Sequence, residues 1–201
     1  MSKTDRAKMT LNKFGFDYFT GLKAVLENLP YREIGKFVKT IWQAYKKEKT
    51  IFFCGNGGSA ATASHLAADI GKNTVMNGKA RFKTMALTDN VAWLTAVGND
   101  LAYEDIFVEQ LKNFGQKNDV LVVVSGSGNS PNVIKAIKWA TTNGLKTVGL
   151  LGFHGGKAKK MIDVCVLVPV EHYGYVEGVH SEIHHFLVEA LKLLVKNDLS
   201  L

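Results

Sequence analysis

A histidine and an aspartate four positions apart follow a glycine-rich turn near the start of the chain. His65 and Asp69 lie in "IFFCGNGGSAATASHLAAD" (51–69), where an apolar run ends at "CGNGGS" and small residues follow. An i, i+4 spacing puts both side chains on one face of a helix. An imidazole and a carboxylate so placed can bind a metal ion or move a proton. Such a pair alone is more often a solvated or core contact, so its function depends on partners elsewhere in the chain.

The C-terminal segment supplies candidate partners. Four of the six histidines lie between residues 172 and 185, in and before "GYVEGVHSEIHHF". Imidazole nitrogens and carboxylate oxygens are natural zinc ligands. Spacing does not choose among the candidates, because several pairs share a helix face. His180 and His184 are four residues apart, Glu177 and His184 are seven apart, and Glu177 and His185 lie about 80° apart around the helix. The candidates are Glu177, His180, His184 and His185.

A second loop, "SGSGNSPNV", has the composition of a phosphate-binding turn. Ser125, Ser127 and Ser130 offer three hydroxyl groups, and the glycines allow backbone N–H groups to approach a ligand closely. A helix begins at this loop, so the positive end of its dipole also favours an anion. The loop is not a Walker A motif, because no Gly-Lys-Ser/Thr follows. The alternative, serine capping of the helix, explains Ser130 but leaves the other hydroxyls without a role.

The first loop, "GNGGSA", can be interpreted in two ways. Gly55, Gly57 and Ala60 form a degenerate dinucleotide-binding fingerprint, with Asp89 as a candidate ribose-binding acid. That interpretation leaves the serine-rich loop without a purpose. A small phosphosugar uses both loops, with one loop holding the phosphate and the other the sugar hydroxyls.

Apolar runs of strand length alternate with helical patterns along the chain, which predicts an α/β fold with a doubly wound parallel sheet. The expected strands are 50–54, 82–88, 119–125, 146–152 and 163–170. The expected helices are 11–28, 31–47, 58–72, 91–114 with a break at "GND", 131–144, a short basic helix before the last strand, and 176–197. The chain is predicted to be one domain over 1–201, with a helical pair in 1–48 and the five-stranded sheet core and C-terminal helix in 49–201.

Composition narrows the classes of function. The chain is 46% hydrophobic and 21% charged, which is typical of a globular domain. No apolar run reaches the ~18 residues that span a membrane, and residues 1–10 lack the apolar segment of a secretory signal. The net charge of +7 comes from dispersed lysines without interleaved aromatic residues, which argues against nucleic acid as a partner. Cys54 and Cys165 lie in strand-like runs and are expected to be buried thiols in a cytoplasmic protein.

Four segments together resemble the sugar-isomerase (SIS) domain family and, within it, the phosphoheptose isomerases. They are "CGNGGSAATASH", "AVGND", "VVSGSGNSPNVIKAI" and "GYVEGVHSEIHH", and the likeness extends over almost the whole chain. The resemblance implies a zinc-dependent aldose–ketose isomerase with one divalent ion per subunit. It also implies conversion of sedoheptulose 7-phosphate to D-glycero-D-manno-heptose 7-phosphate through an enediolate, and a homotetramer with sites at subunit interfaces.

The resemblance also assigns roles residue by residue. Substrate contacts fall on Asn56, Gly57, Gly58, Ser59, Asp69, Asn99, Asp100 and Glu177, and the phosphate falls on Ser125, Gly126, Ser127 and Ser130. Metal ligands fall on His65, Asp69, Glu177 and His185, and proton transfer on Asp69 and His185. Two positions depart from the family pattern, because Asp69 stands where the family has glutamate and Glu177 where it has glutamine. The resemblance favours His185 over His184.

Two other functions remain as alternatives. One is a non-catalytic SIS domain that binds a phosphosugar or a protein, as in a regulatory branch that lacks the last histidine. The other is an oxidoreductase that uses "GNGGSA" for a nicotinamide cofactor. Metal content separates the enzyme from the first alternative, and nicotinamide binding tests the second.

Overall fold

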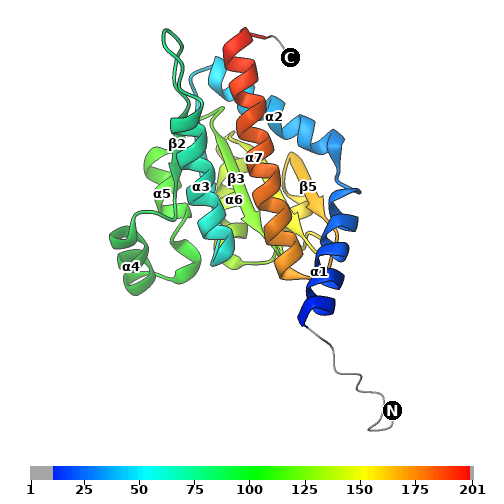
Figure 1. Ribbon diagram of the computed structural model, residues 1–201. Coiled ribbons are helices and arrows are strands. Elements are labelled where there is room, and N and C mark those ends of the chain that lie inside the picture. The colour runs from blue at the N-terminus through cyan, green and yellow to red at the C-terminus, as the bar shows by residue number, and fades with distance from the viewer. Residues whose placement is uncertain (1–10, 200–201) are drawn as a thin grey trace.

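The structure is a computed structural model that describes residues 11–199 (Figure 1). Residues 1–10, on which the argument against a secretory signal rests, lie outside the described part. The ends of the domain predicted over 1–201 lie outside it as well.

A parallel sheet of five strands forms the centre of the described chain. Its order is β2-β1-β3-β4-β5, and every neighbouring pair is parallel. The strands are apolar because both faces are covered, and all six residues of β3 are buried. The predicted doubly wound α/β fold is confirmed. The strands are β1 (Thr50–Cys54), β2 (Lys83–Ala86), β3 (Val120–Ser125), β4 (Lys146–Gly152) and β5 (Val164–Val168).

The helices agree with the periodic segments of the sequence, with shifted ends. The C-terminal helix begins three residues earlier than expected, because His172 caps it: its Nδ1 accepts a hydrogen bond from the backbone N–H of Tyr175 at 3.2 Å. The helices are α1 (Leu11–Leu26), α2 (Tyr31–Lys46), α3 (Gly58–Asn73), α4 (Val91–Asp100), α5 (Val108–Phe114), α6 (Pro131–Thr142) and α7 (Tyr173–Asn197), with 3₁₀ turns η1 (Tyr103–Asp105) and η2 (Ala158–Lys160).

The helices cover the two faces of the sheet as separate layers. Phe53 packs with α2, α3 and α7 on one face, whereas its neighbour Phe52 packs with α5 and α6 on the other. This alternation follows from the two-residue period of a strand. On the first face α3 and α7 lie side by side (Figure 1). Both begin at the carboxyl end of the sheet, so they run in the same direction, and the first residues of α3 lie beside residues about one turn into α7.

Two further features bear on function. None of the helices in residues 11–199 is long and apolar enough to cross a membrane. Cys54 is fully buried, Cys165 is half-buried, and both are free thiols. Burial raises the pKa of both thiols, which keeps them protonated and unreactive.

Candidate active site

The two glycine-rich loops meet at the carboxyl ends of β1 and β3. These strands are neighbours, but the helices that follow them, α3 and α6, lie on opposite faces of the sheet. Such a reversal point is where open α/β sheets bind ligands. A cavity of about 280 Å³ lies there, and among the predicted substrate-binding residues Asp69, Asn99 and Asp100 are missing from its lining. The lining is Asn56, Gly57, Gly58, Ser59, Val124, Ser125, Gly126, Ser127, Ser130, Tyr173 and Glu177.

The serine-rich loop has a folded turn and a hydroxyl that the helix does not use. Ser125 Oγ accepts a hydrogen bond from the N–H of Gly128 at 3.0 Å, and Ser127 Oγ accepts one from Asn129 at 3.2 Å. Ser130 stands at the N-cap of α6, yet its side chain makes no capping hydrogen bond. Serine capping therefore does not account for Ser130. Its hydroxyl and the start of α6 are available to an anion.

A pair of asparagines, which the sequence did not single out as a pair, joins the two loops. Asn56 Nδ2 donates to Asn132 Oδ1 at 3.0 Å, and Asn132 Nδ2 donates back to Asn56 Oδ1 at 2.8 Å. The Tyr103 hydroxyl also donates to Asn56 Oδ1 at 3.0 Å. The Asn56 amide is thus committed to holding the loops together. Nothing in the local pattern signals this contact, because its partners are 76 and 47 residues away.

Glu177 lies against the first turn of α3. A Cβ added to Gly58 would be 2.6 Å from Glu177 Oε2 and 2.7 Å from Oε1. The carboxylate therefore occupies the space that any larger residue at position 58 would need. The positive end of the α3 dipole favours an anion at this place.

Replacing Gly58 with alanine should displace Glu177 from the cavity and lower sugar-phosphate turnover by at least about tenfold, since small misplacements of site groups are costly. Steady-state kinetics on the purified variant measures this. Gly35→Ala is the matched control, because a Cβ at that exposed position of α2 meets nothing within 4 Å. The control should retain full turnover and gain up to about 1 kcal/mol in free energy of unfolding. Equal turnover in the two variants would contradict the role given to this contact.

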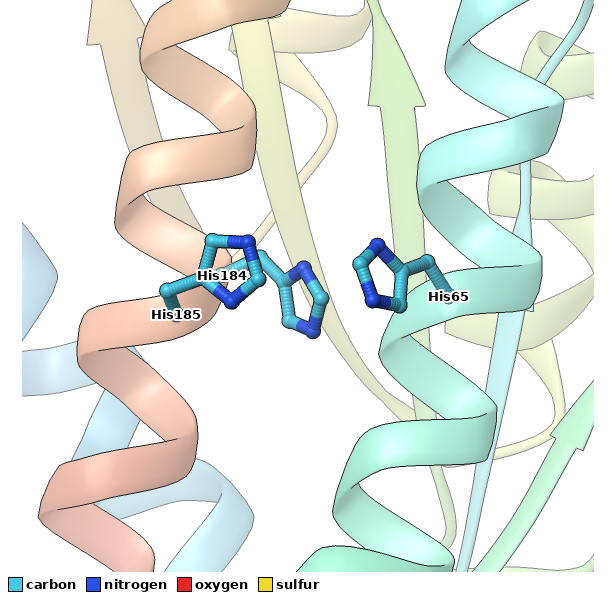
Figure 2. A group of neighbouring side chains, drawn as sticks. All are labelled: His65, His184 and His185. Carbon is cyan, nitrogen blue, oxygen red and sulfur yellow. The ribbon is translucent and has the colours of Figure 1, made fainter.

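Three histidines converge in the space between α3 and α7. One ligand atom from each of His65, His184 and His185 lies within 4.8 Å of the others. Figure 2 shows His65 reaching from α3 and the other two rings reaching from α7. His184 is fully buried, whereas His65 and His185 are exposed. Three imidazoles at this spacing could hold a metal ion.

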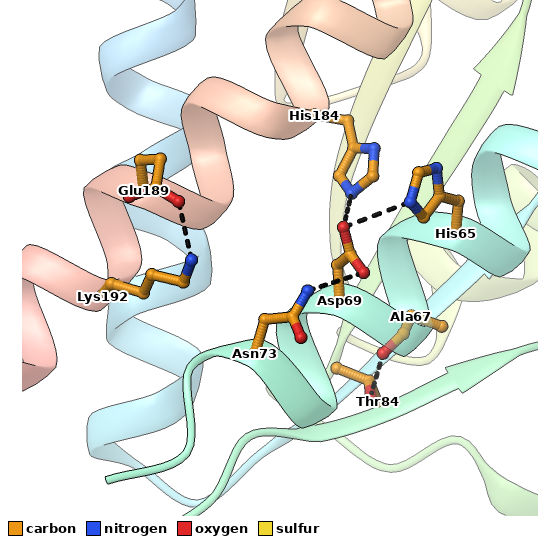
Figure 3. Close-up of polar contacts among 8 residues, drawn as sticks. All are labelled: His65, Ala67, Asp69, Asn73, Thr84, His184, Glu189 and Lys192. Atoms are coloured by element: carbon orange, nitrogen blue, oxygen red, sulfur yellow. Dashed lines mark hydrogen bonds and ion pairs between the residues drawn. The ribbon is translucent and has the colours of Figure 1, made fainter.

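Asp69 adds a carboxylate to this group. Its Oδ2 lies 3.2 Å from His65 Nε2 and 3.2 Å from His184 Nε2, while its Oδ1 accepts a hydrogen bond from Asn73 Nδ2 at 2.9 Å (Figure 3). Asn73 thereby turns the second oxygen toward the two rings. Burial, and then the charges of His65 and His185, lower the pKa of His184 to about 4. The His184 ring is therefore neutral at pH 7.

The structure brings together three of the four residues to which the resemblance assigns the metal. His65 lies beside both Asp69 and His185, but Glu177 is not a member of the group, and its carboxylate lies against Gly58 instead. His184 joins the group instead. His180, the remaining candidate on this helix, is buried in the core, is not a member of the group and makes no side-chain hydrogen bond of good geometry.

Asn99 and Asp100 lie apart from both centres. They end α4 on the surface, where Asn99 Nδ2 donates to Asp100 Oδ1 at 2.8 Å. Asp89, the candidate ribose-binding acid, lines a different groove beside β2 and accepts hydrogen bonds from Ser64 and Thr88.

The chain is similar in sequence and in fold to known proteins. Residues 17–152 match the SIS domain family. A phosphoheptose isomerase of Rhodospirillum rubrum is 44% identical over 68% of this chain and 72% of its own length, and one of Clostridium acetobutylicum is 39% identical over 80% and 81%. The solved structure of a phosphoheptose isomerase from Neisseria gonorrhoeae superposes with a TM-score of 0.85 at 30% identity, covering 92% of this chain and all of that one.

Proposed function

The chain belongs to the SIS-domain family and, within it, to the phosphoheptose isomerases, and on this premise we propose that it interconverts sedoheptulose 7-phosphate and D-glycero-D-manno-heptose 7-phosphate. The observation that carries the proposal is the pairing of an anion-binding cavity with a histidine–carboxylate cluster farther along the same helix. The chain is an isomerase, so the alternatives of a purely binding SIS domain and of a nicotinamide enzyme are not favoured.

The phosphate end of the substrate is assigned to the serine-rich loop. The free hydroxyl of Ser130, the backbone N–H groups of Gly126 and Ser127, and the start of α6 offer donors to a phosphate. Gly57, Gly58 and Ser59 face the sugar from the opposite side of the cavity. The Asn56 side-chain amide is assigned a positioning role in the cavity, because it is already hydrogen-bonded to Asn132 and Tyr103.

The spacing of the two centres suits a long sugar. From Gly58 at the cavity to His65 at the cluster, α3 rises by about 10 Å. An extended heptose 7-phosphate spans on the order of 10 Å from phosphorus to C1, given bonds of about 1.5 Å. A heptose that lies beside Gly58 is therefore long enough to extend toward the histidines.

The residues of the cluster fit a divalent ion. His184 offers a buried ring whose Nε2 already faces the Asp69 carboxylate, and His65, Asp69 and His185 add donors of the kinds that zinc prefers. A zinc ion bound here would polarise the substrate carbonyl and stabilise the negative charge of the enediolate oxygen. Asn73 holds the Asp69 carboxylate in place for this role.

Isomerisation requires removal of a proton from C1 of the ketose and delivery of a proton to C2. We assign these transfers to Asp69 and His185, whose carboxylate and imidazole can each accept and return a proton. Asp69 is only 19% exposed, so bulk water is partly excluded from its carboxylate. His185 is exposed and can exchange its proton with solvent.

Assembly and location are further parts of the proposal. Helix α1 has no buried residue and exposes Leu11, Phe14, Phe16 and Phe19, an apolar surface that a second subunit can cover. We assign this surface to a homotetramer, in keeping with the family. The buried free thiol of Cys54 supports a location in the reducing cytoplasm.

Purified protein should isomerise sedoheptulose 7-phosphate, and removal of divalent metal with a chelator should abolish turnover by at least about a hundredfold. Added zinc should restore it. Metal analysis and a coupled assay on the same sample measure both quantities. Turnover that survives complete metal removal would contradict the metal-assisted mechanism. Bound metal with no turnover of any ketose 7-phosphate would contradict the isomerase assignment.

A further inference from the structure

We propose that His184 is itself a metal ligand, so that His65, Asp69, His184 and His185 form a four-ligand site within one subunit. The inference rests on the proposed function, because it concerns the same metal centre. It gives His184 the place that the family resemblance gives to Glu177.

The distances around Asp69 are compatible with those of a coordination sphere. With metal–ligand bonds of about 2.0–2.1 Å, neighbouring ligands of a zinc ion are about 3 Å apart. Asp69 Oδ2 lies 3.2 Å from His65 Nε2 and 3.2 Å from His184 Nε2. Two pairs of candidate ligands are thus already at this distance, and His185, one nitrogen of which lies within 4.8 Å of those of the other two rings, would move closer to bind the same ion.

The His184 ring is buried beside a carboxylate and is incompletely paired. Its Nε2 lies 3.2 Å from Asp69 Oδ2, whereas its Nδ1 makes no hydrogen bond. An incompletely paired buried ring is costly, so an ion that binds it lowers that cost. The ring faces His65 and Asp69 between α3 and α7 (Figures 2 and 3), so an ion bound by those two residues would also meet His184.

Glu177 is too far away to share this site within the subunit. Its carboxylate touches Gly58, and Gly58 precedes His65 on α3 by seven residues, or about 10 Å. Two ligands of one zinc ion, each bonded at about 2.0–2.2 Å, cannot lie that far apart, and Glu177 is not a member of the group. Glu177 therefore remains a free carboxylate at the sugar-binding cavity.

His184 also gives a reason for the shorter acid at position 69. Asp69 Oδ2 already touches both Nε2 atoms, so the extra methylene of a glutamate would drive the carboxylate into the rings. Asn73 fixes Oδ1 and leaves no freedom to swing away. Aspartate at 69 and histidine at 184 are thus matched parts of one site.

The test measures zinc affinity directly, by competition with a chromophoric chelator on the full-length apoprotein. His184→Asn should weaken zinc binding by at least about a hundredfold, since loss of a ligand costs no less than loss of its supporting contacts. Glu177→Gln should change the affinity by less than about threefold. His180→Asn is the matched control, because it removes another buried histidine of α7 that is not in the group.

X-ray absorption of the zinc-loaded wild-type protein gives a second measurement that does not depend on a variant folding. Three imidazoles around the zinc support the proposal, and two overturn it. Loss of affinity in Glu177→Gln with none in His184→Asn would also overturn it and would place a partner's carboxylate at the metal. Turnover is measured separately. Zinc bound through His184 in a protein that does not isomerise the sugar would contradict the proposed function but not the role of His184. Isomerisation by a protein whose zinc has only two imidazole ligands would contradict the role of His184 but not the proposed function.

Discussion

Replacing Asp69 with asparagine should lower kcat/KM for sedoheptulose 7-phosphate by roughly a hundred- to ten-thousand-fold, the range expected for loss of a group that transfers a proton. Asparagine keeps the size of the side chain and can still meet Asn73. It removes the negative charge that faces His65 Nε2 and His184 Nε2 at 3.2 Å. The change therefore tests charge and basicity at one oxygen, with little effect on packing. Steady-state kinetics at saturating zinc measures the change in kcat/KM. Saturating zinc ensures that a lower rate is not caused by incomplete metal binding.

Glu189→Gln is the matched control for Asp69. Glu189 lies one turn after His185 on α7, is 71% exposed and pairs only with Lys192 among the described contacts (Figure 3). Neutralising it should leave kcat/KM within about twofold, because exposed ion pairs contribute little. If the two variants are equally active, Asp69 carries neither the metal nor the proton, and the cluster between α3 and α7 is not the reaction centre.

The fold was predictable because the strands are buried on both faces. An unbroken apolar run such as β3 is typical of a parallel sheet, and the helices that separate the strands have a clear period. The ends of elements were less predictable. The C-terminal helix begins at Tyr173 because the imidazole of His172 acts as the cap, a role that residue preferences give to serine, threonine, aspartate or asparagine.

The cavity was predictable for a topological reason. The carboxyl ends of neighbouring parallel strands lie at one edge of a sheet, so loops after β1 and β3 must meet. The contact between Asn56 and Asn132 was not predictable, since it depends on how two distant loops are oriented. The choice among the C-terminal histidines was open for a similar reason. The lateral packing of α3 against α7 decides which rings meet His65, and spacing along α7 alone does not encode that packing.

The same packing buries His180, and this creates a sensitivity to acid. Burial lowers the pKa of His180 from 6.5 to about 4, with the backbone of Leu151 partly opposing the shift. Between pH 6.5 and pH 4 the unfolded chain binds a proton at this position and the folded chain does not. The contribution of the neutral His180 to the free energy of unfolding is therefore complete above about pH 6.5 and is lost progressively as the pH falls. At about 1.36 kcal/mol per pH unit, the loss from this one residue approaches about 3 kcal/mol at pH 4.

Replacing His180 with leucine should remove that part of the acid sensitivity. An apolar side chain suits the buried position and has no proton to gain, so the variant should lose about 3 kcal/mol less than the wild type between pH 6.5 and pH 4. Urea unfolding of the metal-free proteins at several pH values measures the difference, and metal-free samples prevent acid release of zinc from adding to the slope. His184, whose pKa is lowered to about 4 as well, is present in both proteins and cancels in the comparison. Parallel stability curves for the two proteins would mean that His180 gains its proton in the folded state, and so that water or a charge reaches a ring that the packing of α7 shields.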